Sequence, residues 1–454
     1  MHKFDDQASK ILLKVLSHTI ERLSLDPPIL DYPKSVEFFE KNAPSLITEV
    51  GNSIDKVFDQ YKNTIEQSII SADSPRNLSF IPAAPTKASM IFDLVVSAGS
   101  LNGISWQEAS GAVWVENQVI RWIADLVGFP EEAGGCFVAG GTNGNLSSLV
   151  VAREEHRKKH KDHSKRLAII CSDQTHSSVK STAKVMDCDV IVVPTNDSFQ
   201  LTRESIENEL KVHSKKYKEL DIFAIVATAG TTNLGVIDDI YGISEYAKSN
   251  KIWLHVDGAY GGAGLLSPKV KDLFSGIEHA DSFIVDPHKW LFAPFDCAAV
   301  IYRNKHLASE VHSQQANYLD ILHDEEAGDN PSDYAFHLSR RARGLPIWFS
   351  LSVYGVDAYR QAVESSLDIA KYAADEIKKS SYLTLLIEPS LSVVAFEREN
   401  WGWEECKNWS TEQLKKQVCF VVPSLVRGKP VFRFAFLNPE TSKEIVDEIL
   451  LSLE

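Results

Sequence analysis

The sequence predicts an α/β protein whose core is a mainly parallel sheet. Between about Thr86 and Glu310, short apolar runs alternate with helical stretches, which is typical of strand–helix–strand units. The first 85 residues lack this alternation, and a second, smaller group of strands follows a long helical region near the C-terminus. We therefore expect a helical extension at 1–85, a large α/β domain at 86–345 and a small α+β domain at 346–454.

The N-terminal extension is expected to hold two amphipathic helices, from about Gln7 to Leu23 and from Ser45 to Ile70, with a break at Pro27-Pro28. Two helices bury little apolar surface between them. We therefore expect this extension to pack on another subunit.

Four apolar runs in the middle of the chain predict strands of the large sheet. They are Leu167 to Cys171, Val190 to Val193, Ile222 to Ala227 and Ile252 to Val256. Crossovers between parallel strands have one hand, so the loops that follow these strands are expected at one edge of the sheet.

The C-terminal part is predicted to begin with a long helical region, His337 to about Lys379. Strands are expected at Leu391 to Phe396 and Val431 to Phe436, and a closing helix from Thr441. Before this region, Val311 to Phe336 has little periodicity and many charged and turn residues. A loop of this length inside a domain is either disordered or functional.

Charge and cysteine content indicate which partners and which cellular compartment to expect. The 454 residues carry 47 basic and 62 acidic side chains, a net charge of −15, which argues against nucleic acid or an anionic membrane as partner. Six cysteines lie without a Cys-x-x-Cys pair or metal spacing, so we expect reduced thiols and no metal site. The N-terminus has no apolar signal-type segment, and no run is long enough to span a bilayer. We expect a cytoplasmic protein.

One lysine, Lys289, follows an apolar strand on a His-Lys-Trp turn. The apolar flanks Phe283-Ile284-Val285 and Trp290-Leu291-Phe292 can partly desolvate its amine, which lowers the pKa of a lysine and suits it to form an imine with an aldehyde. The lysine is therefore a candidate attachment point for an aldehyde cofactor.

A carboxylate, Asp257, ends the apolar strand of Ile-Trp-Leu-His-Val-Asp, and the small Ala259 follows it. Such an aspartate can hold a proton on a pyridine nitrogen, and a small residue lets a flat ring lie against the strand end. Asp257 and Lys289 are 32 residues apart, which predicts one strand–helix–strand unit between them and places both at the same edge.

A glycine-rich turn, Gly140-Gly141-Thr142-Asn143-Gly144, separates a short strand from a helix that opens near Thr142. The free N–H groups of a helix N-terminus form a phosphate seat. The turn lacks the Gly-x-Gly-x-x-Gly dinucleotide spacing, and no Gly-Lys-Ser/Thr follows it. A further strand end, at Ala168 to Ser178, carries His176 toward the same edge.

Together these segments resemble the group II pyridoxal-phosphate decarboxylases, which act on aromatic amino acids, histidine and glutamate. The resemblance runs from about Ser74 to Tyr354 and is strongest at Asp-Pro-His-Lys-Trp290. It implies the aspartate aminotransferase fold type (fold type I), with a seven-stranded, mainly parallel sheet, pyridoxal 5'-phosphate as cofactor and a homodimer with shared active sites.

The resemblance also implies roles for individual residues. Lys289 would be the Schiff-base lysine and Asp257 the partner of the pyridinium nitrogen. Ala259 would lie under the cofactor ring and His176 would stack over it. The remaining cofactor-binding positions are the phosphate loop residues Gly140, Gly141 and Thr142, the ring-side Thr228, and His288 beside the lysine.

Two further residues, Tyr334 and Asp286, correspond less directly to the family's pattern. Tyr334, in the loop before Ser-Arg-Arg-Ala-Arg343, corresponds to a flap tyrosine that helps to protonate the product. Asp286 stands where the animal aromatic enzymes have asparagine, which leaves its role on the phosphate side open.

The substrate pocket implied by the resemblance draws on Phe80, Ile81 and Pro82 and, from the partner chain, on Asn102 and Ile104. Aromatic-specific relatives have larger apolar groups at the last two positions. This difference favours a side chain smaller or more polar than an indole.

The predicted reaction is decarboxylation of an L-amino acid to its amine and CO2. An aminotransferase would need an arginine for the substrate carboxylate, and Arg433 is the candidate in the small domain. An aldehyde synthase would replace the flap tyrosine or the stacking histidine, and this chain keeps both. The residues are also compatible with a carbon–carbon lyase and with a catalytically silent cofactor-binding protein.

Overall fold

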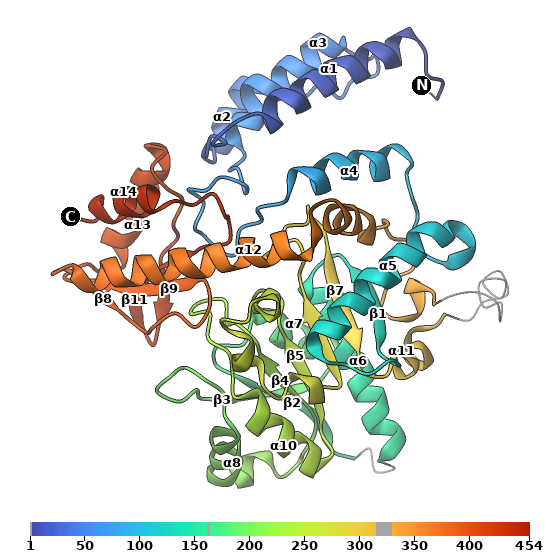
Figure 1. Cartoon of the computed structure of the whole chain (residues 1–454), viewed down its shortest axis with the longest axis vertical. Coiled ribbons are helices and arrows are strands. Elements are labelled where there is room, and N and C mark those ends of the chain that lie inside the picture. The colour runs from blue at the N-terminus through green and yellow to red at the C-terminus, as the bar shows by residue number, and fades with distance from the viewer. Residues whose placement is uncertain (1, 161–163, 315–328) are drawn as a thin grey trace.

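The computed structural model describes residues 2–160, 164–314 and 329–454. Its largest element is a seven-stranded sheet in the order β1-β7-β6-β5-β4-β2-β3 (Figure 1). Only β7 runs antiparallel to its neighbours, so the prediction of a mainly parallel sheet is confirmed. The strands are β1 (Gly134–Val138), β2 (Arg166–Ser172), β3 (Asp189–Val193), β4 (Leu220–Thr228), β5 (Trp253–Asp257), β6 (Ser282–Val285) and β7 (Ala298–Tyr302).

Helices cover both faces of this sheet (Figure 1). Alternate residues of β5 show the division, because Leu254 and Val256 belong to one buried apolar cluster and Trp253 to another. The helices of this region are α4 (Lys87–Ala98), α5 (Trp106–Val127), α6 (Gly141–Lys159), α7 (Ser177–Val185), α8 (Arg203–Val212), α9 (Ser214–Tyr217), α10 (Ile240–Asn250) and α11 (Lys305–His312).

The connection from β5 to β6 differs from the prediction. In place of one α-helix it forms three 3-10 helices, η3 (Gly261–Leu266), η4 (Lys271–Phe274) and η5 (Ile277–His279). Glycine disfavours the α-helix, and these glycines pack too closely for side chains: a Cβ on Gly261 would lie 2.3 Å from the carbonyl oxygen of Ala229. The expected strand–helix–strand unit was wrong in its helix, although β5 and β6 remain parallel neighbours.

The N-terminal extension forms a separate helical hairpin at the top of Figure 1. It contains α1 (Asp6–Leu23), α2 (Val36–Asn42) and α3 (Ile54–Gln60), continued by η1 (Tyr61–Ile65) and η2 (Glu66–Ser68). The first predicted helix is confirmed. The second begins at Ile54 and not at Ser45, because the Ser53 side chain caps the helix by accepting from the N–H of Lys56. None of these helices has a buried residue within the chain.

The long helix α12 (Gly344–Lys379) crosses from the large sheet to the small one, with a break at Gly355 (φ 78°). It begins at Gly344 and not at the predicted His337, because residues 340–343 form a loop whose three arginines bind carboxylates of other segments. The short helix η7 (Pro331–Asp333) precedes this loop. The antiparallel small sheet has the order β10-β11-β9-β8, which confirms both predicted strands. Its elements are β8 (Leu383–Leu385), β9 (Val393–Arg398), α13 (Trp403–Lys415), β10 (Ser424–Val426), β11 (Lys429–Ala435) and α14 (Lys443–Leu451).

No helix within the described ranges is long and apolar enough to cross a membrane. The six cysteines are all free and buried.

Candidate active site

The carboxyl ends of β1, β2, β4, β5 and β6 lie at one edge of the large sheet, as parallel strands require. Thr228 pairs in register with Asp257, which pairs with Ile284 of β6. The structure therefore brings the nine candidate cofactor residues to this edge: Gly140, Gly141, Thr142, His176, Thr228, Asp257, Ala259, His288 and Lys289.

Lys289 is held by a buried carboxylate. Its Nζ lies 2.9 Å from Oδ2 of Asp286, which is 2 % exposed, whereas the lysine side chain is 24 % exposed. The same oxygen accepts a hydrogen bond from the N–H of Gly141 at 3.3 Å. Asp286 thus connects the lysine to the first turn of α6. The sequence did not indicate this link, because Asp286 differs from the asparagine of the animal aromatic enzymes.

Asp257 is buried at the end of β5 and accepts two hydrogen bonds. Nδ2 of Asn145, on α6, donates to its Oδ2 at 3.0 Å, and the N–H of Ala259 donates to its Oδ1 at 3.1 Å. Asn145 was missed in the sequence. A stripe of small and polar residues at helical spacing, Gly141, Gly144, Asn145 and Ser148, could have indicated it.

His176 is anchored on one nitrogen and exposed on the rest of its ring. Its Nδ1 accepts from the N–H of Ser178 at 3.2 Å and lies 2.8 Å from the Ser178 hydroxyl, so the imidazole caps α7. Because Nδ1 is an acceptor, the ring proton of neutral His176 resides on Nε2.

His288 is buried beside the lysine. Its Nδ1 accepts from the N–H of Cys297 at 2.9 Å, and its Nε2 lies 3.6 Å from Asp286. Burial lowers the pKa of His288, which favours the neutral imidazole.

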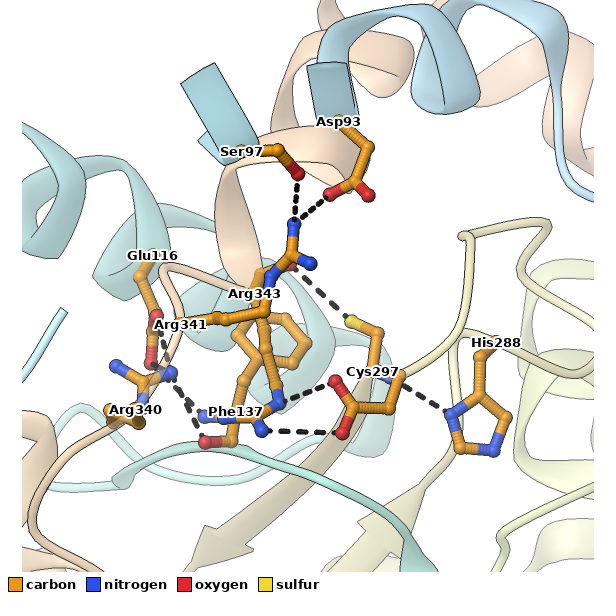
Figure 2. A network of polar contacts seen from close by, with 10 residues as sticks. Asp93, Ser97, Glu116, Phe137, His288, Cys297, Arg340, Arg341 and Arg343 are labelled. Atoms are coloured by element: carbon orange, nitrogen blue, oxygen red, sulfur yellow. Dashed lines mark hydrogen bonds and ion pairs between the residues drawn. The ribbon is translucent and has the colours of Figure 1, made fainter. Parts of the chain in front are cut away.

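Figure 2 shows that His288 and Cys297 lie at one end of a network of arginines in the 340–343 segment. Cys297 Sγ contacts the carbonyl of Arg343, whose guanidinium binds Asp296 at 2.9 and 3.2 Å. The neighbouring Arg341 binds Asp93 of α4 at 2.7 Å. These contacts tie the segment before α12 to the turn that follows Lys289.

Among the described ion pairs of the 340–343 segment, the pair of Arg340 with Glu116 is the most buried. Its Nη2 lies 2.8 Å from both carboxylate oxygens of Glu116 on α5, and the two side chains are 1 % and 2 % exposed. Arg340 also donates to the carbonyl of Gly103 and to that of Phe137, the latter seen in Figure 2. The pair therefore joins α5, β1 and the 340–343 segment.

Part of the predicted flap, residues 315–328, lies outside the described residues. Tyr334 is described, and it is 4 % exposed within the apolar cluster that also contains Val138 and Val300. Its hydroxyl donates to Asp329 at 2.9 Å. Burial and Asp329 raise the pKa of Tyr334 well above its usual range, so in this arrangement the tyrosine is a weak proton donor.

The predicted substrate residues fall into two groups. Phe80 is 63 % exposed, while Ile81 and Pro82 pack inward behind it. Asn102 and Ile104 lie beside the 332–341 segment of their own chain: the N–H of Arg340 reaches Asn102 Oδ1 at 3.4 Å, and that of Ser332 reaches the Ile104 carbonyl at 3.2 Å.

Arg433, the candidate carboxylate-binding residue of an aminotransferase, is 4 % exposed. Its Nη2 donates to the carbonyls of Phe80 and Thr232 at 2.6 and 2.5 Å. Burial lowers the pKa of Arg433 to about 10. Its guanidinium is thus committed to main-chain oxygens, and it connects β11 to the Phe80 segment.

Comparison with known proteins decides the family. The family described as "Pyridoxal-dependent decarboxylase conserved domain" matches residues 38–399, which is most of the chain. The chain belongs to this family. It is 28 % identical to the aromatic-L-amino-acid decarboxylase of Bacillus atrophaeus over 90 % of this chain and 86 % of that protein.

Solved structures agree on the fold of this decarboxylase. The crystal structure of Oryza sativa TDC with PLP and tryptamine matches with a TM-score of 0.91 at 21 % identity, and covers 100 % of this chain and 99 % of that one. Rhodiola rosea 4-hydroxyphenylacetaldehyde synthase matches with a TM-score of 0.86 at 22 % identity, over 98 % and 96 % of the two chains. The chain is therefore a carboxy-lyase that uses pyridoxal 5'-phosphate.

The residues at the sheet edge of this decarboxylase fit that cofactor. Two buried oxygens there, Thr228 Oγ1 and Asp286 Oδ1, have no hydrogen-bond partner among the described residues. The N-cap residue of α6, Gly140, has no side chain to cap the helix, and the space around a Cβ on it is open. The edge thus offers the first turn of α6 to a phosphate, with the N–H of Gly141 donating to Asp286 in this arrangement, and unpaired polar atoms to a bound ring.

Proposed function

We propose that the chain converts an L-amino acid to the corresponding amine and CO2, with Lys289 as the residue that holds the cofactor. The observation that carries this proposal is the meeting of Lys289, Asp257, His176 and the α6 N-terminus at one sheet edge in a member of the decarboxylase family. When bound, pyridoxal phosphate supplies a sink for the electrons left at Cα as CO2 departs.

Each residue has a defined part in this proposal. The first turn of α6, with Gly140, Gly141 and Thr142, would bind the phosphate through its N–H groups and the helix dipole. Asp257 would hold a proton at the ring nitrogen, and its two N–H donors keep the carboxylate oriented toward that task. Ala259 would lie against the ring, and Thr228 and His288 would line it.

In this proposal His176 would donate a proton to Cα. Its Nε2 carries the transferable proton, while Nδ1 is fixed by Ser178. Tyr334 remains a second donor in this proposal, and it would first have to leave Asp329, because in the described arrangement its hydroxyl is engaged there.

We further propose a substrate with a side chain smaller or more polar than an indole. Phe80, Ile81 and Pro82 would form one wall of its pocket. Asn102 and Ile104 would come from the partner chain, where relatives for aromatic substrates have larger groups. The chain is also 28 % identical, over 71 % of its length, to the L-2,4-diaminobutyrate decarboxylase of Acinetobacter baumannii, a protein named for a small polar substrate.

A homodimer with shared active sites is part of the proposal. Helices α1 and α3 bury no residue within the chain, and Leu13 and Ile20 of α1 are each 65 % exposed. On α4, Ile91 and Val95 are also exposed. Apolar faces of this extent are typical of an interface. Extension 1–85 would then join the subunits, and 86–345 and 346–454 would form the large and small domains.

The six buried free thiols support a reducing, cytoplasmic setting for the enzyme.

The test is to incubate the cofactor-loaded protein with each L-amino acid while recording CO2, amine, aldehyde, keto acid and peroxide. We expect CO2 and amine in equal amounts from one class of substrate, none from Lys289→Ala, and normal turnover from the exposed control Lys271→Ala. Aldehyde with peroxide would assign the chain to the synthases, and keto acid without CO2 to the aminotransferases. Normal turnover by Lys289→Ala would refute the proposal.

A further inference from the structure

A row of buried side chains runs along β5 toward the active-site edge. Trp253, His255 and Asp257 are alternate residues of this strand, so they lie on the same face, which is covered by α6. Their exposed fractions are 8 %, 0 % and 4 %. The mechanism above uses only Asp257, which leaves a fully buried histidine without an assigned purpose.

A chain of hydrogen bonds connects this row, through Ser282 and His255, to Asn145 on α6. Trp253 Nε1 donates to Ser282 Oγ at 2.8 Å, and that hydroxyl lies 2.8 Å from His255 Nδ1. On the other side of the ring, His255 Nε2 lies 2.7 Å from Oδ1 of Asn145. An amide oxygen only accepts, so His255 carries its proton on Nε2 and receives the Ser282 hydroxyl proton at Nδ1.

The state of His255 supports this order. Burial lowers the pKa of His255 to about 4, so the ring is neutral near pH 7 and has one proton to donate. With its oxygen bound to His255, the Asn145 amide can point its nitrogen in only one direction.

Both N–H groups of that amide reach residues of the active site. Nδ2 of Asn145 lies 3.0 Å from Asp257 Oδ2 and 2.9 Å from Ser178 Oγ. The Ser178 hydroxyl in turn lies 2.8 Å from Nδ1 of His176. One amide therefore contacts the carboxylate directly and the imidazole through a single hydroxyl.

The geometry points to Asn145 as a positioning residue that, oriented by His255, holds the Asp257 carboxylate and the His176 imidazole in the orientations that the ring nitrogen and the ring face would need. This inference rests on the proposed function, which gives those two residues their roles. A carboxylate held by two N–H donors is preorganised for the ring nitrogen, and no reorientation is needed when the cofactor binds.

The test compares cofactors that differ only at the ring nitrogen. The apoprotein of Asn145→Ala is titrated with pyridoxal phosphate. We expect about tenfold weaker binding, because the Asp257 carboxylate is then no longer held in position before the cofactor binds. With 1-deazapyridoxal phosphate, which has CH in place of the nitrogen, the loss should disappear. Equal losses with both cofactors would mean a merely structural role and would overturn the inference. The exposed Asn250→Ala is the matched control.

A second pair of variants keeps the inference testable if Asn145→Ala does not fold. His255→Gln retains a side-chain N–H for the Asn145 oxygen, whereas His255→Leu does not, so only the leucine variant should bind pyridoxal phosphate more weakly. Equal affinities of these two variants would overturn the inference.

Asp257→Ala separates the two proposals. If it binds pyridoxal phosphate as tightly as the wild type, the role of Asp257 in the proposed function is wrong. If it binds weakly while Asn145→Ala binds normally, only the role of Asn145 is wrong.

Discussion

Removing one partner of the buried pair of Arg340 and Glu116 should lower the free energy of unfolding by several kcal/mol. In Glu116→Ala, the guanidinium remains in a site where its side chain is 1 % exposed, with only the carbonyls of Gly103 and Phe137 as acceptors. The N–H of Phe137 also loses its acceptor, Oε1 of Glu116 at 3.0 Å. Removing one partner of a buried ion pair costs about 3–5 kcal/mol, and we expect the upper half of that range because three hydrogen bonds are lost.

The assay is urea unfolding of the apoprotein at pH 7, followed by far-ultraviolet circular dichroism. The matched control is Glu207→Ala, which breaks an ion pair with Arg203 whose side chains are 50 % and 48 % exposed. Water screens this pair, so its loss should hardly change the free energy of unfolding. The double variant Glu116→Leu/Arg340→Met should be more stable than Glu116→Ala alone, because it leaves no uncompensated charge. A loss for Glu116→Ala no larger than that of Glu207→Ala would refute this reasoning.

Three further outcomes are expected. Gly141→Ala should weaken cofactor binding about tenfold or more in an apoprotein titration, because the added Cβ would lie 2.9 Å from an oxygen of Asp286. The control Gly51→Ala should bind the cofactor normally, because no described atom lies within 4 Å of its added Cβ. Thr228→Val should leave apoprotein stability unchanged or raise it by up to about 1 kcal/mol, since it removes a buried hydroxyl that has no hydrogen-bond partner in the described part of the chain. The same change should weaken cofactor binding, and a clear loss of stability would contradict this reasoning. The pKa of His255 is lowered to about 4, so the unfolded chain binds a proton there first as the pH falls below about 6.5. Relative to His255→Gln, the wild type should therefore lose up to about 1.4 kcal/mol of unfolding free energy per pH unit between about pH 6.5 and 4. If the unfolding free energies of the two proteins changed in parallel with pH, a lowered pKa of His255 would be excluded.

The sequence alone predicted most strands of the large sheet and the residues that follow them, but not the antiparallel strand β7. Local sequence carries this information, because short apolar runs rich in β-branched residues and bounded by glycine, proline or polar residues favour buried strands. The single hand of parallel crossovers then placed Lys289, Asp257 and His176 at the same edge, even though the expected helix between β5 and β6 was wrong.

Only the tertiary structure decided how these residues are held. Asn145 meets Asp257 across 112 positions of the chain, Gly141 meets Asp286 across 145, and Arg340 meets Glu116 across 224. Spacing within a segment carries no information about such pairs, since they depend on the register and packing of separate elements. The burial of Tyr334 against Asp329 has the same origin, because a turn-rich segment reads as an exposed loop until the surfaces that cover it are known.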